Sequence, residues 1–156
     1  MGIDPRAKSK EKLKPPAPLP HISRRALQRV RNALLPPTAC PYCQGPVALV
    51  NNRHIYGREC GDWPYAYHCA PCDALVGLHP DTDIPLGTMA NQELRAARVT
   101  NKRHFHNFMA KMGFTRSSAY LWLARSMGID REECHFGWFD LEACKRAGDI
   151  CRRHLK

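Results

Sequence analysis

Four cysteines in two close pairs are the residues with the clearest chemistry in this sequence. Cys40 and Cys43 form one Cys-x-x-Cys turn, and Cys69 and Cys72 form a second. Both thiolates of such a turn can reach one ion, and two turns supply the four sulfurs that Zn²⁺ binds tetrahedrally at about 2.3 Å. The spacing therefore predicts one bound zinc ion.

Two other interpretations of the cysteine pairs are open. The pairs could form disulfides, or one pair could be redox-active, as in thioredoxin-like folds. A redox motif is single and opens a helix in a βαβ context, whereas Pro41 and Pro71 lie inside the two turns and strands are expected after them. The metal interpretation fits the pattern better.

The residues around the pairs predict the short antiparallel strands of a zinc ribbon. We expect strands over residues 47–50, 54–56, 63–68 and 74–78. The first two should pair as a hairpin across the turn-prone residues 51–53. The ribbon would cover residues 38–80, which are too few to bury a core unaided, so metal binding would supply folding free energy there.

The rest of the chain predicts an arm and helices. Residues 1–20, rich in Pro and Lys, are expected to be a disordered basic arm, and residues 21–37 a basic helix with Ser23 as its N-cap. Residues 81–156 predict a helical domain. The fold class is therefore α+β, a small four-cysteine zinc ribbon packed with a mainly helical C-terminal part.

Apolar periodicity places three helices in the helical domain, over residues 91–112, 116–127 and 141–155. Thr115 and Asp140 are the expected N-caps of the last two. Cys144 and Cys151 lie about 10 Å apart along the last helix, too far to share an ion. They are therefore expected to be small core residues.

Positive charge is concentrated near the N-terminus. The net charge is +10, and residues 1–31 hold nine basic side chains against two acidic ones. A basic arm on a nearly neutral body is common in nucleic-acid binders, because the arm neutralises phosphates without reading sequence. A solubilising tail is the simpler alternative.

Further cations lie along one stripe of the helix over residues 91–112 and on the exposed side of the helix over residues 116–127. These two helices could form a helix-turn-helix. An αα-hairpin packed on the ribbon is the simpler arrangement. The candidate nucleic-acid contacts are Lys8, Lys10, Lys12, Lys14, Arg24, Arg25, Arg29, Arg95, Arg98, Lys102, Arg116 and Arg125.

Eight short motifs run in order along the chain, at residues 40–43, 56–57, 69–74, 76–79, 85–90, 93–95, 119–124 and 134–137. On these motifs the chain resembles a family of zinc-finger-containing proteins of unknown function, found mostly in bacteriophages, prophages and bacteria. The resemblance covers roughly residues 38–152. It implies a zinc ribbon joined to a helical part, and no known reaction.

A second metal site is a weaker candidate. His79, Cys134 and His135 carry ligand atoms that suit zinc, and all three belong to the family pattern, but a fourth ligand would be needed. His135 as a structural histidine is the simpler interpretation.

Catalysis is not expected. His104 and His106 invite comparison with His-rich nuclease motifs, but they lie in a helical pattern with cationic neighbours. No Ser-His-Asp order, phosphate loop or close carboxylate pair stands out. We therefore expect a nucleic-acid-binding protein, with duplex DNA as the leading partner. The alternatives are a module that docks on a host nucleic-acid enzyme or defence complex and, third, a metal-dependent nuclease.

The cellular setting follows from what the sequence lacks. The N-terminus has no apolar secretion segment, and no apolar run approaches the roughly 18 residues of a membrane span. The expectation is a bacterial or phage-infected cytoplasm, with no membrane partner.

Overall fold

The computed structural model describes residues 2–155, and the chain divides into two compact units, Met1–Asn91 and Gln92–Lys156. The division lies later than the expected boundary at residue 80. Backbone bridges from Leu75 to Ala90 and from Leu78 to Pro85 tie the following loop to the sheet. Residues 81–91 therefore belong to the ribbon unit.

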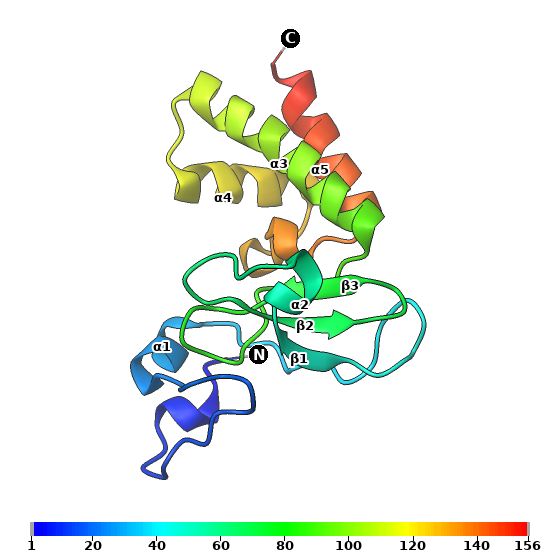
Figure 1. The fold of residues 1–156 in the computed structure, drawn as a ribbon. Coiled ribbons are helices and arrows are strands. Elements are labelled where there is room, and N and C mark those ends of the chain that lie inside the picture. Colours follow the sequence, from blue (N-terminus) through cyan, green and yellow to red (C-terminus); the bar gives the residue numbers. More distant parts are fainter. Residues whose placement is uncertain (1, 156) are drawn as a thin grey trace. The chain divides into compact units, whose positions relative to one another are not determined.

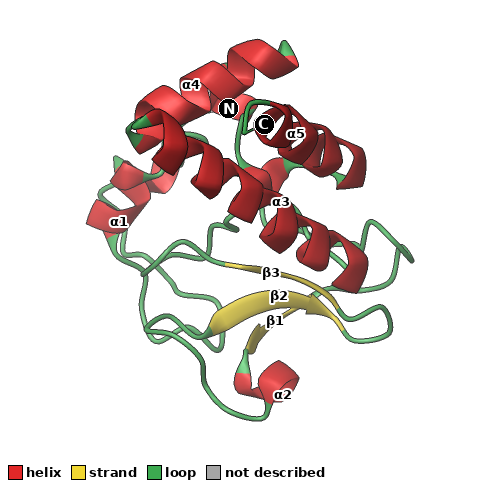
Figure 2. Cartoon of the chain, turned by 90° about the horizontal axis from the view of Figure 1, so that it is seen from above, coloured by secondary structure: helices red, strands yellow, loops and turns green. Residues whose placement is uncertain are grey.

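The first unit is built on a three-stranded antiparallel sheet in the order β1-β2-β3 (Figure 2). Its strands are β1 (Ala48–Asn51), β2 (Tyr65–Cys69) and β3 (Ala74–Gly77). β2 pairs with both neighbours, with Ala48 opposite His68 in one register and Cys69 opposite Ala74 in the other. The sheet thus carries the second cysteine pair at the turn between β2 and β3.

The prediction of a strand over residues 54–56 is wrong, because this segment forms the short helix α2 (Arg53–Tyr56). The side chain of Asn52 holds the loop closed, since its Nδ2 donates to the Cys60 carbonyl at 2.9 Å and its Oδ1 accepts from the Cys60 N–H at 3.0 Å. β1 consequently pairs with β2, and α2 projects from the connection between them (Figure 2).

The segment before the ribbon is ordered, in contrast to the disordered arm expected over residues 1–20. It contains the one-turn helix η1 (Pro5–Ala7), and it is followed by α1 (Arg24–Arg29) (Figure 1). Ala7 is 1% exposed and packs in a core cluster with Leu27, while Leu19 joins the cluster around the sheet. These contacts bury apolar side chains that a disordered arm would leave in water.

Helix α1 begins where the sequence predicts, because the Ser23 side chain accepts from the N–H of Ala26 at 3.2 Å. It is shorter than the helix expected within residues 21–37. Val30 leaves the helical conformation, with φ −88° and ψ 104°, and buries its side chain.

The second unit consists of α3 (Gln92–Met112), α4 (Arg116–Met127) and α5 (Leu141–Arg153), with the 3₁₀ turns η2 (Arg131–Glu133) and η3 (Phe136–Trp138) before α5. The expected N-caps are confirmed, since Thr115 accepts from Ser118 N–H and Asp140 from Ala143 N–H. Local signals therefore set where α4 and α5 begin.

The core of the second unit follows the predicted periodicity. Helices α3 and α5 lie side by side (Figures 1 and 2). Phe105 and Phe108 of α3 are fully buried and meet Tyr120 and Trp122 of α4, with ring centroids 4.6 and 4.2 Å apart. Met112, which the apolar periodicity of residues 91–112 places on the same face, is instead 48% exposed. Among the described residues, no helix is both long and apolar enough to cross a membrane.

Candidate metal centre

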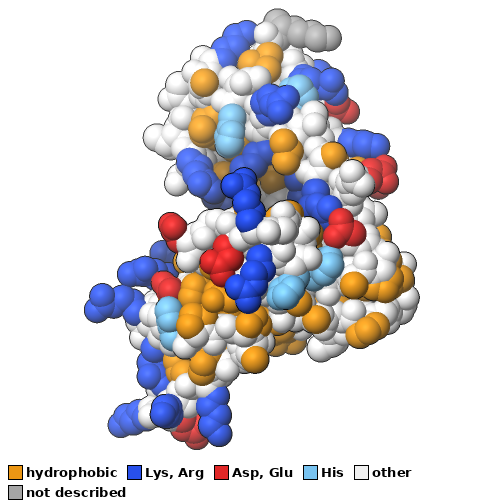
Figure 3. Space-filling view, in the orientation of Figure 1, with side chains coloured by type: hydrophobic (Ala, Val, Ile, Leu, Met, Phe, Trp, Pro, Cys, Tyr) orange, Lys and Arg blue, Asp and Glu red, His pale blue; other side chains and the backbone are white. Residues whose placement is uncertain are grey.

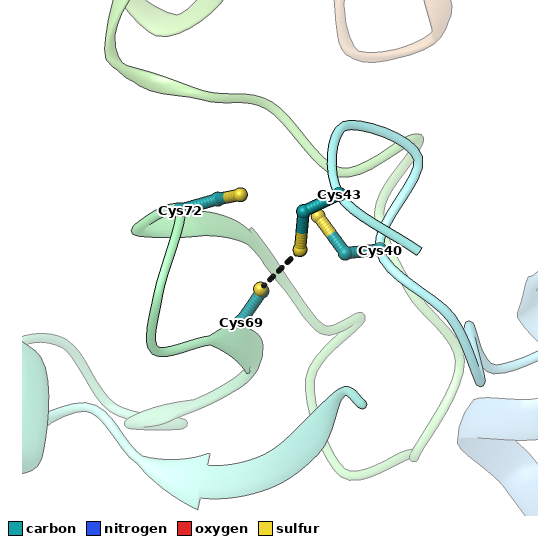
Figure 4. Close-up of side chains that lie close together, drawn as sticks. All are labelled: Cys40, Cys43, Cys69 and Cys72. Atoms are coloured by element: carbon teal, nitrogen blue, oxygen red, sulfur yellow. Dashed lines mark hydrogen bonds between the residues drawn. The ribbon is translucent and has the colours of Figure 1, made fainter. Parts of the chain in front are cut away.

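The four predicted zinc ligands come together in the first unit (Figure 4). The Sγ atoms of Cys40, Cys43, Cys69 and Cys72 all lie within 4.8 Å of one another, and those of Cys43 and Cys69 are 3.6 Å apart. A tetrahedral ion with bonds of 2.3 Å separates its sulfurs by about 3.8 Å. The cluster therefore fits one zinc ion, and all four cysteines are free thiols.

The turn that carries the first pair is shaped around its sulfurs. The N–H of Tyr42 points to the Cys40 Sγ at 3.4 Å, and the N–H of Gly45 points to the Cys43 Sγ at 3.3 Å. A Cβ on Gly45 would lie only 3.1 Å from the Cys43 sulfur, so glycine allows the close approach. Such N–H groups stabilise thiolates, the form that binds metal.

The cluster lies at the edge of the core. Cys40 and Cys69 are fully buried beside Tyr67, Val76 and other apolar side chains, while Cys43 is exposed. Metal binding would therefore connect the two turns to the packing of the sheet.

The thiols of the cluster differ in how easily they ionise. Burial opposes the ionisation of Cys40, but N–H groups of Tyr42 and Cys43 and the neighbouring thiols lower its pKa to about 7. The hydrogen bond with Cys43, followed by burial, raises the pKa of Cys72 to about 12. Without a cation one thiolate forms readily and opposes the next; a divalent ion removes this conflict.

The remaining cysteines of the second unit do not join this group. Cys144 and Cys151 are fully buried in α5, as expected for small core residues, and burial raises the pKa of Cys151 to about 12. Within residues 2–155, the four-cysteine cluster is the one group that brings three or more metal-ligating side chains together.

The three residues of the candidate second metal site belong to different units. His79 lies in the first, and Cys134 and His135 lie in the second. Cys134 is fully buried, and burial raises its pKa to about 11. A zinc site at these residues stays a prediction.

The cations proposed as nucleic-acid contacts differ in how free they are. Lys8, Lys10, Lys12 and Lys14 are exposed, as are Arg25 and Arg29 of α1. Arg24 is instead engaged, since it donates from Nε to the Arg6 carbonyl and from Nη2 to the Glu11 carbonyl. Arg24 therefore helps to hold the segment that carries the lysines.

Of the cations on the second unit, Arg116 and Arg125 are exposed, while Arg95, Arg98 and Lys102 are partly buried. Arg98 donates to the Phe139 carbonyl, with Nη2 at 2.9 Å. Its guanidinium thus fixes the chain ahead of α5.

Sequence reasoning missed two features. Arg6 bridges Asp4 and Asp83, and Arg131 lies over the Tyr120 ring at 4.8 Å. No local pattern reveals these contacts, because Arg6 and Asp83 are 77 residues apart and Tyr120 and Arg131 belong to different helices, α4 and η2.

Comparison with curated proteins finds no match, and neither does comparison with solved structures. A family model described as a zinc-finger-containing domain matches residues 36–154, which cover the four-cysteine cluster and the three α-helices of the second unit. The chain therefore belongs to this family of zinc-finger-containing domains, whose function is unknown.

Proposed function

We propose that this protein is a zinc-ribbon protein of a bacterial or phage-infected cytoplasm that binds nucleic acid, duplex DNA above all, and that it is not an enzyme. The proposal is carried by one observation: a set of exposed cations on an ordered segment of the first unit. The set consists of Lys8, Lys10, Lys12, Lys14, Arg25 and Arg29, and we call it the N-terminal cation set.

The segment that bears these cations is held in place. Arg6 pairs with Asp4 at 2.7 Å and with Asp83 at 2.6 Å, and Gln28 of α1 donates to the Ala7 carbonyl at 3.2 Å. Figure 3 shows Lys and Arg side chains gathered over this segment and α1, at the lower left. Cations on an ordered segment lose less conformational freedom on binding than cations on a flexible tail. This smaller entropy loss favours binding to the regularly spaced phosphates of a duplex.

A salt titration tests the proposal. Binding of labelled duplex DNA, followed by fluorescence anisotropy, should weaken as salt rises, with a slope of about −0.9 in log K against log salt for each phosphate contacted. Replacing Lys8, Lys10, Lys12 and Lys14 by Ala should flatten the slope by up to about 3.6 units. Point changes suit this test better than removal of residues 1–20, because Ala7 and Leu19 belong to the core.

A matched control removes four exposed cations elsewhere. Replacing Arg103, Lys145, Arg146 and Arg153 by Ala takes the same charge from the second unit. We expect it to change the slope much less. Equal effects of the two variants, or binding without a salt slope, would contradict a role for the N-terminal cation set.

A second candidate is a module that docks on a protein. It is favoured by exposed large side chains in the first unit, with Leu35 89% exposed, Tyr56 53% and Leu86 48%. Capture of host proteins that survives nuclease treatment, together with no DNA binding, would support docking.

A metal-dependent nuclease is the third candidate. It would show strand cleavage that requires added divalent metal and is lost in His104→Ala or His106→Ala. Unchanged DNA after incubation with Mg²⁺ or Mn²⁺ is the result that we expect.

A further inference from the structure

Two arginines of the second unit gather over one buried tyrosine. The Cζ atoms of Arg116 and Arg131 lie 5.7 and 4.8 Å from the ring centroid of Tyr120. The centroid of the His135 ring lies 6.2 Å from the same centroid. Tyr120 is only 4% exposed, so both guanidinium groups contact a buried aromatic ring.

Neither guanidinium forms an ion pair with any carboxylate in residues 2–155. Arg131 makes one long hydrogen bond, from Nη1 to the Cys134 carbonyl at 3.5 Å. A cation–π contact uses the face of a guanidinium and leaves the N–H groups at its edge able to donate. Both positive charges therefore lie against the same ring, Arg116 also bonding the Tyr120 side chain, and both keep N–H groups that can donate to a ligand.

We propose that Arg116 and Arg131, supported by Tyr120, form a phosphate-binding site. The guanidinium fork matches two phosphate oxygens, and a planar group stacked on a ring is already oriented for this contact. The inference rests on the proposed function and extends it. On DNA, the site would hold a backbone phosphodiester as a contact separate from the N-terminal cation set.

The same surroundings disfavour a metal cation at the neighbouring Cys134 and His135. Two guanidinium charges repel a divalent cation and attract an anion. Cys134 is also fully buried, whereas Arg116 is exposed to an incoming phosphate.

Inorganic phosphate is the first probe, added at constant ionic strength against chloride. We expect saturable NMR shifts of the Nε–Hε groups of Arg116 and Arg131 when phosphate is added. In Arg131→Ala the shift of the Arg116 group should be lost. Arg103, exposed on α3 and outside the set of candidate nucleic-acid contacts, is the control, and its signal should not move. Absence of saturable shifts, or equal shifts at Arg103, would overturn the site.

Loss of folding is distinguished from loss of binding by the conservative variant Arg131→Lys. It keeps the charge over Tyr120 but lacks the fork, so it should retain the helical circular dichroism and bind phosphate more weakly than the wild type. Binding equal to the wild type in both Arg131→Lys and Arg131→Ala would contradict the role of Arg131.

Duplexes with 5′-phosphate and 5′-hydroxyl ends identify the source of the phosphate. The double variant Arg116→Ala, Arg131→Ala is compared with the wild type on both duplexes. If its salt slope is flatter by about 2 units on both, the site contacts backbone phosphates. Loss of a preference for the 5′-phosphate end supports the site with a terminal phosphate as its ligand.

The two proposals can fail separately. If the wild type binds inorganic phosphate but no DNA, the phosphate site is supported, with a free phosphate compound as its ligand, and the proposed function is wrong. If inorganic phosphate does not bind and the double variant binds DNA as the wild type does, the site fails while DNA binding stands.

Discussion

Arg6 and Asp83 form a two-pronged ion pair, with Nη2 2.6 Å from Oδ1 and Nη1 3.0 Å from Oδ2. The side chain of Asp83 is only 9% exposed, and Arg6 also holds Asp4. This pair connects the beginning of the chain to the loop after β3. The N-terminal cation set therefore belongs to the folded surface of the ribbon unit.

Arg6→Ala should release the segment around η1. Because the Arg6 side chain is 36% exposed and solvent screens the pair, we expect a loss of only about 1–2 kcal/mol, at or below the lower end of the range for charged hydrogen bonds. Hydrogen exchange at the Ala7 amide, which donates to the Asp4 carbonyl at 3.0 Å, would report the release. Lys8→Ala, at an exposed neighbour, is the control, and unchanged protection of Ala7 in Arg6→Ala would refute the prediction.

A second prediction concerns the packing of α3 on α5. Gly148 lies so close to the side chain of Asn101 that a Cβ at this position would overlap the Asn101 amide. Gly→Ala in an exposed helix stabilises by about 1 kcal/mol, but overpacking a buried position costs about 1–3 kcal/mol. Gly148→Ala should therefore lower the free energy of unfolding of the second unit, measured in urea.

The double variant Asn101→Ala, Gly148→Ala tests the cause. It removes the two atoms of Asn101 that lie closest to the added Cβ. The double variant should therefore lose less free energy of unfolding than the two single variants lose in sum. Arg146→Ala, at an exposed position of α5, controls for helix propensity. Strict additivity of the two changes would show that the clash is not the cause.

The sequence predicted the parts of this molecule that depend on short-range signals. Each cysteine pair makes its own turn, so the ligand spacing identified the zinc cluster directly. The caps at Ser23, Thr115 and Asp140 were equally readable, because a side-chain oxygen accepts from an N–H group three residues later.

The predictions that were wrong concern segments whose structure depends on contacts with residues elsewhere in the chain. Residues 54–56 have strand-forming side chains, but the two bonds between Asn52 and the Cys60 backbone close a loop around them. The first 20 residues have the composition of a disordered arm, and the pair of Arg6 with Asp83 orders them. Composition describes a segment by itself and gives no sign of a partner elsewhere in the chain.

A third prediction is a pH dependence of the second unit. Burial, followed by the charges of Arg131 and Arg116, lowers the pKa of His135 below its usual value of 6.5, although a bond to the Glu132 carbonyl opposes the shift. Between the lowered pKa and 6.5 the unfolded chain binds more protons than the folded chain. Stability should therefore fall as pH falls below about 6.5 and be level, as far as His135 is concerned, above it.

An NMR titration of the His135 ring checks this prediction directly. Arg131→Ala should raise the pKa of His135, because one repelling charge is lost. Arg125→Ala should leave it unchanged, since Arg125 is not among the charges that act on this imidazole. A pKa at or above 6.5 in the wild type would contradict the assigned surroundings of His135.

The last prediction is that one zinc ion holds the ribbon unit together. The free energy of zinc binding in small structural sites is about 10–16 kcal/mol and is folding free energy. Cys69→Ser should release the metal, because it removes a fully buried sulfur at the end of β2, and the sheet should lose its NMR dispersion. The helices of the second unit should persist in circular dichroism, since they form a separate compact unit.

Cys60→Ser provides the matched control, because Cys60 is a free thiol of the same unit that lies outside the cluster. Elemental analysis should give one zinc per chain for the wild type and for Cys60→Ser, and none for Cys69→Ser. No zinc in reduced wild-type protein would refute the ribbon site. Two zinc ions per chain would instead support a second site at His79, Cys134 and His135, and would count against a phosphate site beside them.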